Sequence, residues 1–233
     1  MLVEGASPLP PGLRPRLRVR PRPEGEALRA RDAERQLRFL RGALTLRSTF
    51  MEVGSDDCAV ARCAAGHVER AYAAGSPERV LEPGHPAPNL VPVLSDGVDI
   101  PVPEAAVDAA FSSQLIERLH PRDVLGHLQS VRRVLRRGGR YFCVTSHRYC
   151  APLQAPAGAY RFAAEALREL LAEAGFRRIR FYARIGGIYA EVPYWTLRAL
   201  EALLGVLPSR LREPLAGSRL ARAVLGLYVE AIK

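Results

Sequence analysis

The sequence predicts an α/β protein whose mostly parallel, seven-stranded sheet is covered by helices on both faces. Short apolar segments alternate along the chain with longer segments in which apolar residues recur at helical spacing. Such alternation is typical of parallel sheets, because consecutive strands are joined by crossover helices that cover the faces. A length of 233 residues is enough for one sizeable core, so we expect a single domain.

Glycine marks the ends of several predicted elements. Gly54 follows the first strand, Gly138 and Gly139 precede the fifth strand, and Gly175 ends the helix after it. In chain order we expect a helix at 26–44, a strand at 45–53, a helix at 59–65, strands at 67–74, 89–94 and 107–112, a helix at 124–135, a strand at 140–145, a helix at 163–174, a strand at 179–183, helices at 194–207 and 211–225, and a strand at 227–232.

Composition divides the chain into a tail and a body. Residues 1–26 are rich in proline and arginine, have no periodicity, and are predicted to be an N-terminal tail. Residues 27–233 form the predicted domain. Within it, the segment at about 186–220 is unusually apolar for a surface excursion, and we expect a lid over the acceptor. A dimer interface or a membrane-surface patch is the alternative interpretation of this segment.

The net charge of +10 is carried almost entirely by arginine, since Lys233 is the only lysine. Many arginines lie at solvent-facing spacings along predicted helices. The few aromatic residues are not interleaved with them as base stacking would require. We therefore expect a solvated arginine-rich surface and no nucleic-acid partner.

Neither a membrane span nor a metal site is expected. No apolar run approaches the roughly 18 to 20 residues that cross a bilayer. Residues 1–24 lack the apolar core of a signal peptide, so a cytoplasmic protein is expected. The spacings of the four cysteines do not match paired zinc ligands. These cysteines are Cys58, Cys63, Cys143 and Cys150.

The segment from Ser95 to Thr145 carries the strongest family signal. It reads SDGVDIPVPEAAVDAAFSSQLIERLHPRDVLGHLQSVRRVLRRGGRYFCVT. An acid follows the third predicted strand, Pro-x-Pro leads to an acid in the fourth, and a helix ends in Gly-Gly before the fifth. This order resembles the class I S-adenosylmethionine (SAM)-dependent methyltransferases, especially the type 11 group, over about residues 35–185. The resemblance implies a Rossmann-like methyltransferase fold and SAM as cofactor.

The resemblance also implies where the cofactor binds. In open parallel sheets, ligands bind beyond the carboxyl ends of the strands, at the switch point in strand order. There, Glu52 is expected to orient the methionine end of SAM, Asp96 to accept from the adenine amino group, and Gly97 to donate a backbone N–H nearby. The other expected contacts come from Gly54, Ser55, Asp56, Gly75 and Ser76, and from the backbone carbonyls of Ser112 and Ser113.

Two positions in this site depart from the family pattern. The glycine-rich loop after Glu52 is degenerate, because only Gly54 of the family's glycines is present. Gly75 stands where the family places an acid that binds both ribose hydroxyls, with Ser76 and Glu78 as partial substitutes. Losing hydrogen bonds to a charged acceptor costs about 1.5–3 kcal/mol, which weakens binding roughly tenfold to hundredfold.

Methyl transfer needs few catalytic groups, because proximity and orientation supply much of the rate. A base is needed only when the acceptor is a hydroxyl or an amine that must lose a proton. His120 and His147 follow the fourth and fifth predicted strands and are the candidate bases, whereas His127 is expected on a solvated helix surface. Relatives often have Glu-His where this chain has Glu117 and Arg118.

The acceptor is expected to lie beneath the predicted lid, in contact with Tyr189, Tyr194 and Trp195. Together these features predict a SAM-dependent methyltransferase that methylates an oxygen or a nitrogen of a small apolar or aromatic metabolite, in a biosynthetic pathway. A homodimer is compatible with the apolar segment. The departures leave two alternatives open: a methyltransferase fold that catalyses a cyclisation or an elimination, and a non-catalytic partner protein.

Overall fold

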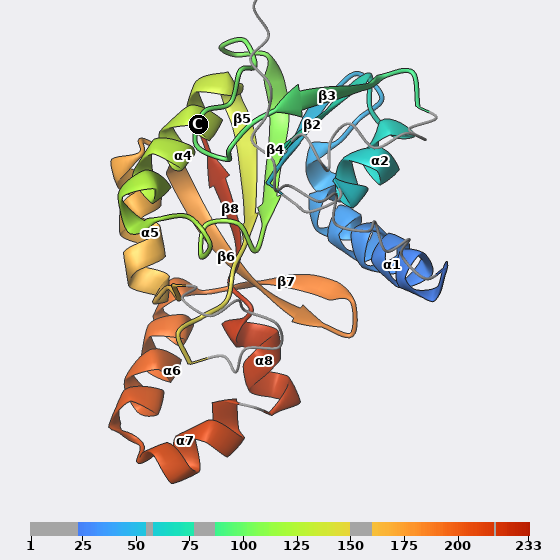
Figure 1. The fold of residues 1–233 in the computed structure, drawn as a ribbon. Helices are drawn as coiled ribbons and strands as arrows, with labels where there is room; N and C mark the ends of the chain where they lie inside the picture. Colours follow the sequence, from blue (N-terminus) through green and yellow to red (C-terminus); the bar gives the residue numbers. More distant parts are fainter. Residues whose placement is uncertain (1–22, 55–57, 77–86, 150–159, 217) are drawn as a thin grey trace, which may run out of the picture.

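The computed structural model contains an eight-stranded sheet flanked by helices (Figure 1). It describes residues 23–54, 58–76, 87–149, 160–216 and 218–233. The strand order is β3-β2-β1-β4-β5-β8-β6-β7. The strands are β1 (Thr49–Val53), β2 (Arg70–Gly75), β3 (Leu90–Leu94), β4 (Val107–Ser113), β5 (Leu135–Val144), β6 (Arg177–Ile185), β7 (Ile188–Val192) and β8 (Tyr228–Ile232).

The first five strands in chain order form the parallel part of the sheet. They pair in parallel, whereas β8 lies antiparallel between β5 and β6. The chain moves outward from β1 to β3 and then returns to the other side of β1 with β4. The pair β1 and β4 is therefore the switch point in strand order. This mixed, mostly parallel α/β fold confirms the predicted fold class.

Helices cover both faces of the sheet: α1 and α2 lie on one face, and α4 and α5 on the other (Figure 1). Successive strand residues point to opposite faces, so Phe50 packs in the cluster under α1 and α2 while Met51 packs under α4 and α5. The helices are α1 (Pro23–Leu40), the 3₁₀-helix η1 (Arg41–Ala43), α2 (Ala59–Ala65), α4 (Pro121–Val134), α5 (Ala164–Glu173), α6 (Tyr194–Val206), α7 (Ser209–Ala216) and α8 (Arg219–Leu225).

The eighth strand corrects the predicted count of seven. β7 lies at the start of the segment at 186–220 that the sequence assigned to a lid. β6 and β7 form a hairpin in which Ile185 pairs with Ile188, so Gly186 and Gly187 make a two-residue turn. Their φ angles are +59° and +88°. Two-residue hairpin turns require such positive angles, which glycine adopts without strain.

The three C-terminal helices project beyond the end of the sheet (Figure 1). The sequence predicted one helix at 211–225, but the structure has α7 and α8 there. Ser218 begins α8, because its hydroxyl oxygen accepts a hydrogen bond from the N–H of Ala221 at 3.2 Å. These helices share a small apolar core of their own, formed by Leu204, Ala216, Ala221 and Leu225.

Several other boundaries differ from the prediction, and two of these differences concern features that the sequence analysis used. α1 begins at Pro23, within the predicted tail at residues 1–26. β5 begins at Leu135, so Gly138 and Gly139 lie inside the strand rather than before it. Among the described residues, no helix is both long enough and apolar enough to span a bilayer.

Candidate functional site

The carboxyl ends of β1, β2, β3 and β4 meet at one edge of the sheet, where most of the predicted cofactor residues lie. Gly54 follows β1, and its N–H donates to the carbonyl of Ala74 in β2 at 2.8 Å. Gly75 ends β2, and its carbonyl accepts from the N–H of Ser95, after β3, at 3.0 Å. These hydrogen bonds continue the sheet pairing into the loops and hold the strand ends together.

The turn after β3 is built around the carboxylate of Asp96. Its Oδ1 accepts hydrogen bonds from the N–H groups of Asp99 and Val98, both at 2.8 Å. These two bonds lower the pKa of Asp96. The hydroxyl of Ser95 donates to the Asp99 carbonyl at 2.6 Å and accepts from the N–H of Gly97 at 3.0 Å. The turn therefore holds a charged carboxylate in a fixed orientation, and the Gly97 amide is engaged with Ser95.

The space around two glycines with positive φ shows whether an adenosyl group fits at this edge of the sheet. Gly54 and Gly97 have φ angles of +72° and +91°. A Cβ atom placed on Gly54 would lie 2.5 Å from Cδ1 of Leu115, and one on Gly97 would lie 3.4 Å from the same atom. Both strand ends thus face one space, which Leu115 fills with a side chain that can change rotamer. These residues fit an adenosyl group when Leu115 turns away.

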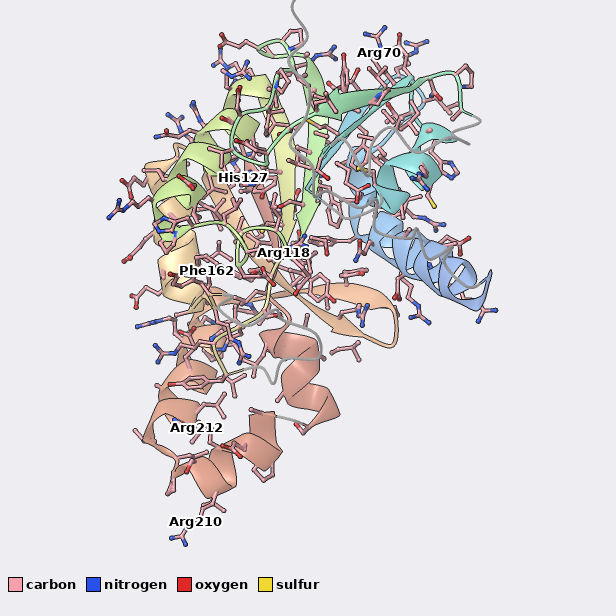
Figure 2. The ribbon with its side chains drawn as sticks, in the orientation of Figure 1. Arg70, Arg118, His127, Phe162, Arg210 and Arg212 are labelled. Atoms are coloured by element: carbon pink, nitrogen blue, oxygen red, sulfur yellow. The ribbon has the colours of Figure 1, made fainter. Side chains whose placement is uncertain are left out.

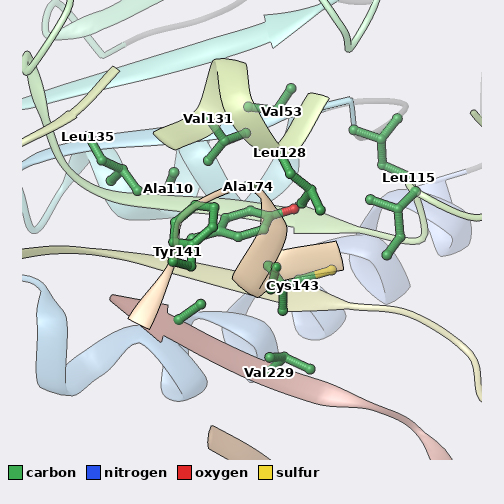
Figure 3. Close-up of a cluster of buried hydrophobic side chains, with 14 of the residues drawn as sticks. Val53, Ala110, Leu115, Leu128, Val131, Leu135, Tyr141, Cys143, Ala174 and Val229 are labelled. Carbon is green, nitrogen blue, oxygen red and sulfur yellow. The ribbon is translucent and has the colours of Figure 1, made fainter. Parts of the chain in front are cut away.

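Leu115 lies at the border of the apolar core, 7% exposed. Figure 3 shows it apart from the dense group around Tyr141 and Leu128. A leucine at the border is freer to rotate than one enclosed on all sides, because fewer neighbours must move.

Glu52 and Arg118 hold the start of the loop after β1. Glu52 is 1% exposed, and its Oε2 accepts from the N–H of Ala61, in the first turn of α2, at 2.6 Å. The positive end of the helix stabilises a carboxylate there. Arg118, labelled in Figure 2, donates from Nη2 to the Gly54 carbonyl at 3.0 Å. Ser55 and Asp56, the other predicted loop contacts, lie outside the described residues.

The ribose side of the predicted site is formed by Gly75 and Ser76. Gly75 is buried at the end of β2, and Ser76 is exposed directly after it. Glu78 lies outside the described residues. The family places its acid at position 75. Among the described residues that follow β2, Ser76 carries the polar side chain closest in sequence to that position.

β4 ends in two serines whose hydroxyls contact other parts of the protein. Ser112 is fully buried, and its Oγ lies 2.6 Å from the hydroxyl of Tyr141. Ser113 Oγ accepts from Nε2 of Gln36, in α1, at 3.4 Å. The resemblance assigns the backbone carbonyls of these two serines, and not their hydroxyls, to the cofactor.

Glu117 is a buried carboxyl group to which the sequence analysis gave no catalytic role. It is 4% exposed and accepts a short hydrogen bond from the hydroxyl of Thr145, directly after β5. Burial raises the pKa of Glu117, and the bond from Thr145 opposes that rise. A carboxyl group with a raised pKa near the ends of β4 and β5 is suited to accept a proton. The signal in the sequence was the Glu of the family's Glu-His pair.

His120, one of the two predicted bases, caps a helix. Its Nδ1 accepts a hydrogen bond from the N–H of Arg122 at 3.3 Å, at the N-terminus of α4. The side chain is otherwise exposed to solvent. One ring nitrogen of His120 is therefore used in the helix cap.

His147, the other predicted base, is fully buried and joins the loop after β5 to α6. Its Nδ1 accepts from the N–H of Tyr149 at 3.1 Å, so the ring proton lies on Nε2 and is donated to Oε1 of Glu201 at 2.6 Å. The same carboxylate oxygen accepts from the N–H of Ala164, at the start of α5, at 2.7 Å. Burial lowers the pKa of His147. Both ring nitrogens are therefore engaged, and the bond from Nε2 anchors α6.

The three aromatic residues expected to contact the acceptor do not converge. Tyr189 of β7 stacks on Phe39 of α1, with ring centroids 4.8 Å apart. Tyr194 stacks on Phe181 of β6, at 5.8 Å. Trp195 is 71% exposed. The β6–β7 hairpin carries Tyr189 to the α1 face, whereas the other two begin α6.

Two hollows of about 350 Å³ each lie on the surface, and neither is lined by Gly54, Gly97 or Leu115. The second is lined in part by Arg38, Arg140 and Tyr189, between α1 and the β6–β7 hairpin. The first hollow is lined by Val98, Asp99, Gly126, Gln129, Ser130 and Arg133.

No group of three or more His, Cys, Asp or Glu side chains arranged for a metal occurs in the described ranges.

Comparison with protein families finds a Methyltransferase domain over residues 85–143, the segment that contains β3, β4, α4 and most of β5. The fold is also shared with solved structures. A SAM-dependent methyltransferase from Thermotoga maritima, described as a possible histamine N-methyltransferase, aligns with a TM-score of 0.61 and 14% identity, covering 90% of this chain and 93% of that chain.

Two other solved structures align equally well. A SAM-dependent methyltransferase from Archaeoglobus fulgidus has a TM-score of 0.61 and 14% identity, covering 89% of this chain and 94% of that chain. Phosphoethanolamine N-methyltransferase 1 from Haemonchus contortus, in complex with phosphoethanolamine and S-adenosylhomocysteine, has a TM-score of 0.61 and 14% identity. The alignment covers 89% of this chain and 43% of that chain. At such identities the likeness shows the fold. A search among curated proteins found no match by sequence.

Proposed function

We propose that this chain is a class I SAM-dependent methyltransferase that methylates an oxygen or a nitrogen of a small apolar or aromatic metabolite. The methyltransferase domain match at residues 85–143 and the shared fold support this proposal. The observation that carries the proposal is the common space between Gly54 and Gly97, beside the Asp96 turn. It lies at the switch point of the sheet, where this architecture binds ligands.

Residues at three strand ends would hold the cofactor. The carboxylate of Asp96, kept charged and oriented by the N–H groups of Asp99 and Val98, would accept a hydrogen bond from the adenine amino group. Gly54 lets the backbone approach the nucleoside closely, because a Cβ there would occupy the same space. The backbone at Ser113 would face the methionine end. SAM supplies a methyl group on a positively charged sulfur, open to displacement by a nucleophile.

Glu117 would act on the acceptor. It lies between the end of β4 and Thr145, next to the strand end that would meet the methionine part of the cofactor. Its raised pKa favours proton uptake from a hydroxyl or an ammonium group when the acceptor is methylated. The buried residues Leu115 and Ile116, which precede it, make this side of the site apolar. That surrounding favours an apolar or aromatic acceptor.

Calorimetric titration with SAM and with S-adenosylhomocysteine tests the cofactor half of the proposal. We expect the wild-type protein to bind both. Asp96→Ala removes the acceptor for the adenine amino group, so binding should weaken about tenfold to hundredfold, equivalent to roughly 1.5–3 kcal/mol. Asp96→Asn keeps one acceptor oxygen and should lose less.

Asp32→Ala is the matched control, since Asp32 is exposed on α1 and pairs with Arg35 one helical turn away. It should leave the affinity unchanged. Absence of binding by the wild-type protein at millimolar concentration of either compound would exclude the proposal. Equal affinity of the wild-type protein and Asp96→Ala would exclude the role of Asp96.

A further inference from the structure

A buried chain of hydrogen bonds connects the turn after β3 with the end of β4. Nδ1 of His127, in α4, lies 2.5 Å from the carbonyl oxygen of Gly97, and its Nε2 lies 3.1 Å from the hydroxyl of Tyr141 in β5. That hydroxyl lies 2.6 Å from Oγ of Ser112. All three side chains are fully buried. His127 points from α4 towards the sheet (Figure 2), and Tyr141 lies among packed apolar side chains (Figure 3).

This burial corrects the expectation that His127 lies on a solvated helix surface. The apolar face of α4 also contains Val124, Leu128 and Val131, so a histidine at position 127 is carried into the core beside them. Desolvation lowers the pKa of His127 to about 4, opposed by the bond to Gly97. The ring is therefore neutral at pH 7.

The direction of every proton in the chain follows from these contacts. A carbonyl oxygen can only accept, so Nδ1 of His127 carries the proton and donates it to Gly97. In the neutral ring Nε2 is then an acceptor, so the hydroxyl of Tyr141 donates to it. The hydroxyl of Ser112 in turn donates to the oxygen of Tyr141. One tautomer of His127 satisfies all the groups.

The bond to Gly97 also fixes the carboxylate of Asp96. The carbonyl of Gly97 and the N–H of Val98 belong to the same planar peptide unit. His127 holds the carbonyl at one end of this unit, while Asp96 Oδ1 accepts from the N–H at the other end, at 2.8 Å. Gly97, at φ +91°, has no Cβ to restrict the unit, so the two hydrogen bonds set its orientation.

We propose that His127 is a positioning residue for adenosyl binding, which holds the Gly97–Val98 peptide and through it the carboxylate of Asp96. The inference rests on the proposed function, because Asp96 is the group proposed to bind adenine. An apolar residue at position 127 would fill the same volume, but it would leave the buried carbonyl of Gly97 without a donor. The hydrogen bond from His127 thus orients the Gly97 carbonyl, which apolar packing at position 127 would not do.

Three variants separate positioning from general stability. His127→Leu removes the donor to Gly97 and should weaken S-adenosylhomocysteine binding at least tenfold. His127→Asn keeps an N–H close to the position of Nδ1 and should bind within about threefold of the wild-type protein. Tyr141→Phe breaks the same buried chain but leaves the bond between His127 and Gly97. It should lower the melting temperature while affinity stays within about twofold.

Nitrogen NMR of the free protein supplies a readout that needs no ligand, and the imidazole proton of His127 should be found on Nδ1. A proton on Nε2 would overturn the proposal. So would equal affinity of the wild-type protein and His127→Leu, or equal weakening in His127→Leu and Tyr141→Phe. A wild-type protein that binds no S-adenosylhomocysteine would overturn the proposed function, and the positioning role with it, even if the NMR tautomer is as expected.

Discussion

At the scale of single residues, Glu117 combines a buried carboxyl group with a position near the proposed reaction. Its side chain is almost inaccessible, and its partner is the neutral hydroxyl of Thr145. Desolvation raises the pKa of Glu117 and outweighs the charge of Arg118 and the N–H of Ser146, which both lower it. A charged carboxylate in this place therefore costs stability, which is a feature of groups that are poised to take up protons.

Glu117→Gln tests this cost through pH. Because the pKa is raised in the folded protein, Glu117 stabilises the fold below its unfolded pKa, and that contribution is lost as pH rises through the folded value. The free energy of unfolding of the wild-type protein, relative to Glu117→Gln, should therefore fall between pH 4 and pH 8 by on the order of 1 kcal/mol. Urea denaturation at several pH values measures it.

The exposed Glu169, in α5, offers the same substitution as a control. Glu169→Gln should run parallel to the wild-type protein over the whole pH range. Parallel curves for Glu117→Gln would contradict the account of its burial.

Some site residues follow from sequence and others depend on tertiary packing. The turn at Asp96 and Gly97 is predictable, because an acid followed by glycine after an apolar strand is typical of such turns. The place of Leu115 is not, since it depends on a rotamer chosen by residues from two distant strand ends. The burial of His127 was missed because a polar residue on an amphipathic helix is ordinarily solvated.

At the scale of elements, a buried carboxylate in α6 connects this helix with α5 and with the loop after β5. Glu201 accepts hydrogen bonds from His147, from the N–H of Ala164 and from Arg198, whose Nη1 lies 3.2 Å away. These partners come from the loop after β5, from α5 and from α6 itself. One side chain therefore joins three elements on the side of the molecule where the acceptor is expected.

Glu201→Ala should lower the free energy of unfolding by about 3 kcal/mol, because buried donors lose their acceptor. Hydrogen exchange should increase in α6 and at the start of α5. Chemical denaturation and exchange measured by mass spectrometry check both effects.

Glu165→Ala is the matched control, since Glu165 pairs with the same Arg198 at 2.6 Å but is half exposed. Such surface pairs contribute about 0–1 kcal/mol. Comparable losses in Glu165→Ala and Glu201→Ala would show that the exposed ion pair, and not the buried carboxylate, holds α6.

Most strands and helices could be predicted, because their apolar periodicity is clear and glycine ends many of them. β7 was missed for a specific reason: the apolar residues of 188–192 were assigned to a lid, although Gly186 and Gly187 are a hairpin signal. The division of 211–225 into α7 and α8 depends on Ser218. That break is local, and a periodicity averaged over the whole segment does not detect it.

At the scale of the whole molecule, shared structure extends further than shared sequence. The Methyltransferase domain match covers residues 85–143, whereas solved methyltransferase structures cover 89–90% of the chain at 14% identity. The matched segment contains the Asp96 turn and the helix before β5, which have specific turn residues. The remaining elements need only apolar residues with the right period, and many sequences satisfy that requirement.

The helices α6, α7 and α8 form a third apolar cluster, beyond the two on the faces of the sheet (Figure 1). Their outer surfaces leave Leu203, Val206 and Leu211 exposed, at 51%, 81% and 57%. The proposed nucleoside site is at the ends of β1 to β4 instead, and it is defined by the place that Leu115 now fills. Binding of an adenosyl group at this edge therefore requires one side chain, that of Leu115, to move.

A crystal structure of the protein grown with saturating S-adenosylhomocysteine would show whether Leu115 moves. We expect the adenine beside Asp96, and the side chain of Leu115 rotated away from Gly54 and Gly97. Density for Leu115 in its present place, with the ligand bound elsewhere or not at all, would contradict this expectation.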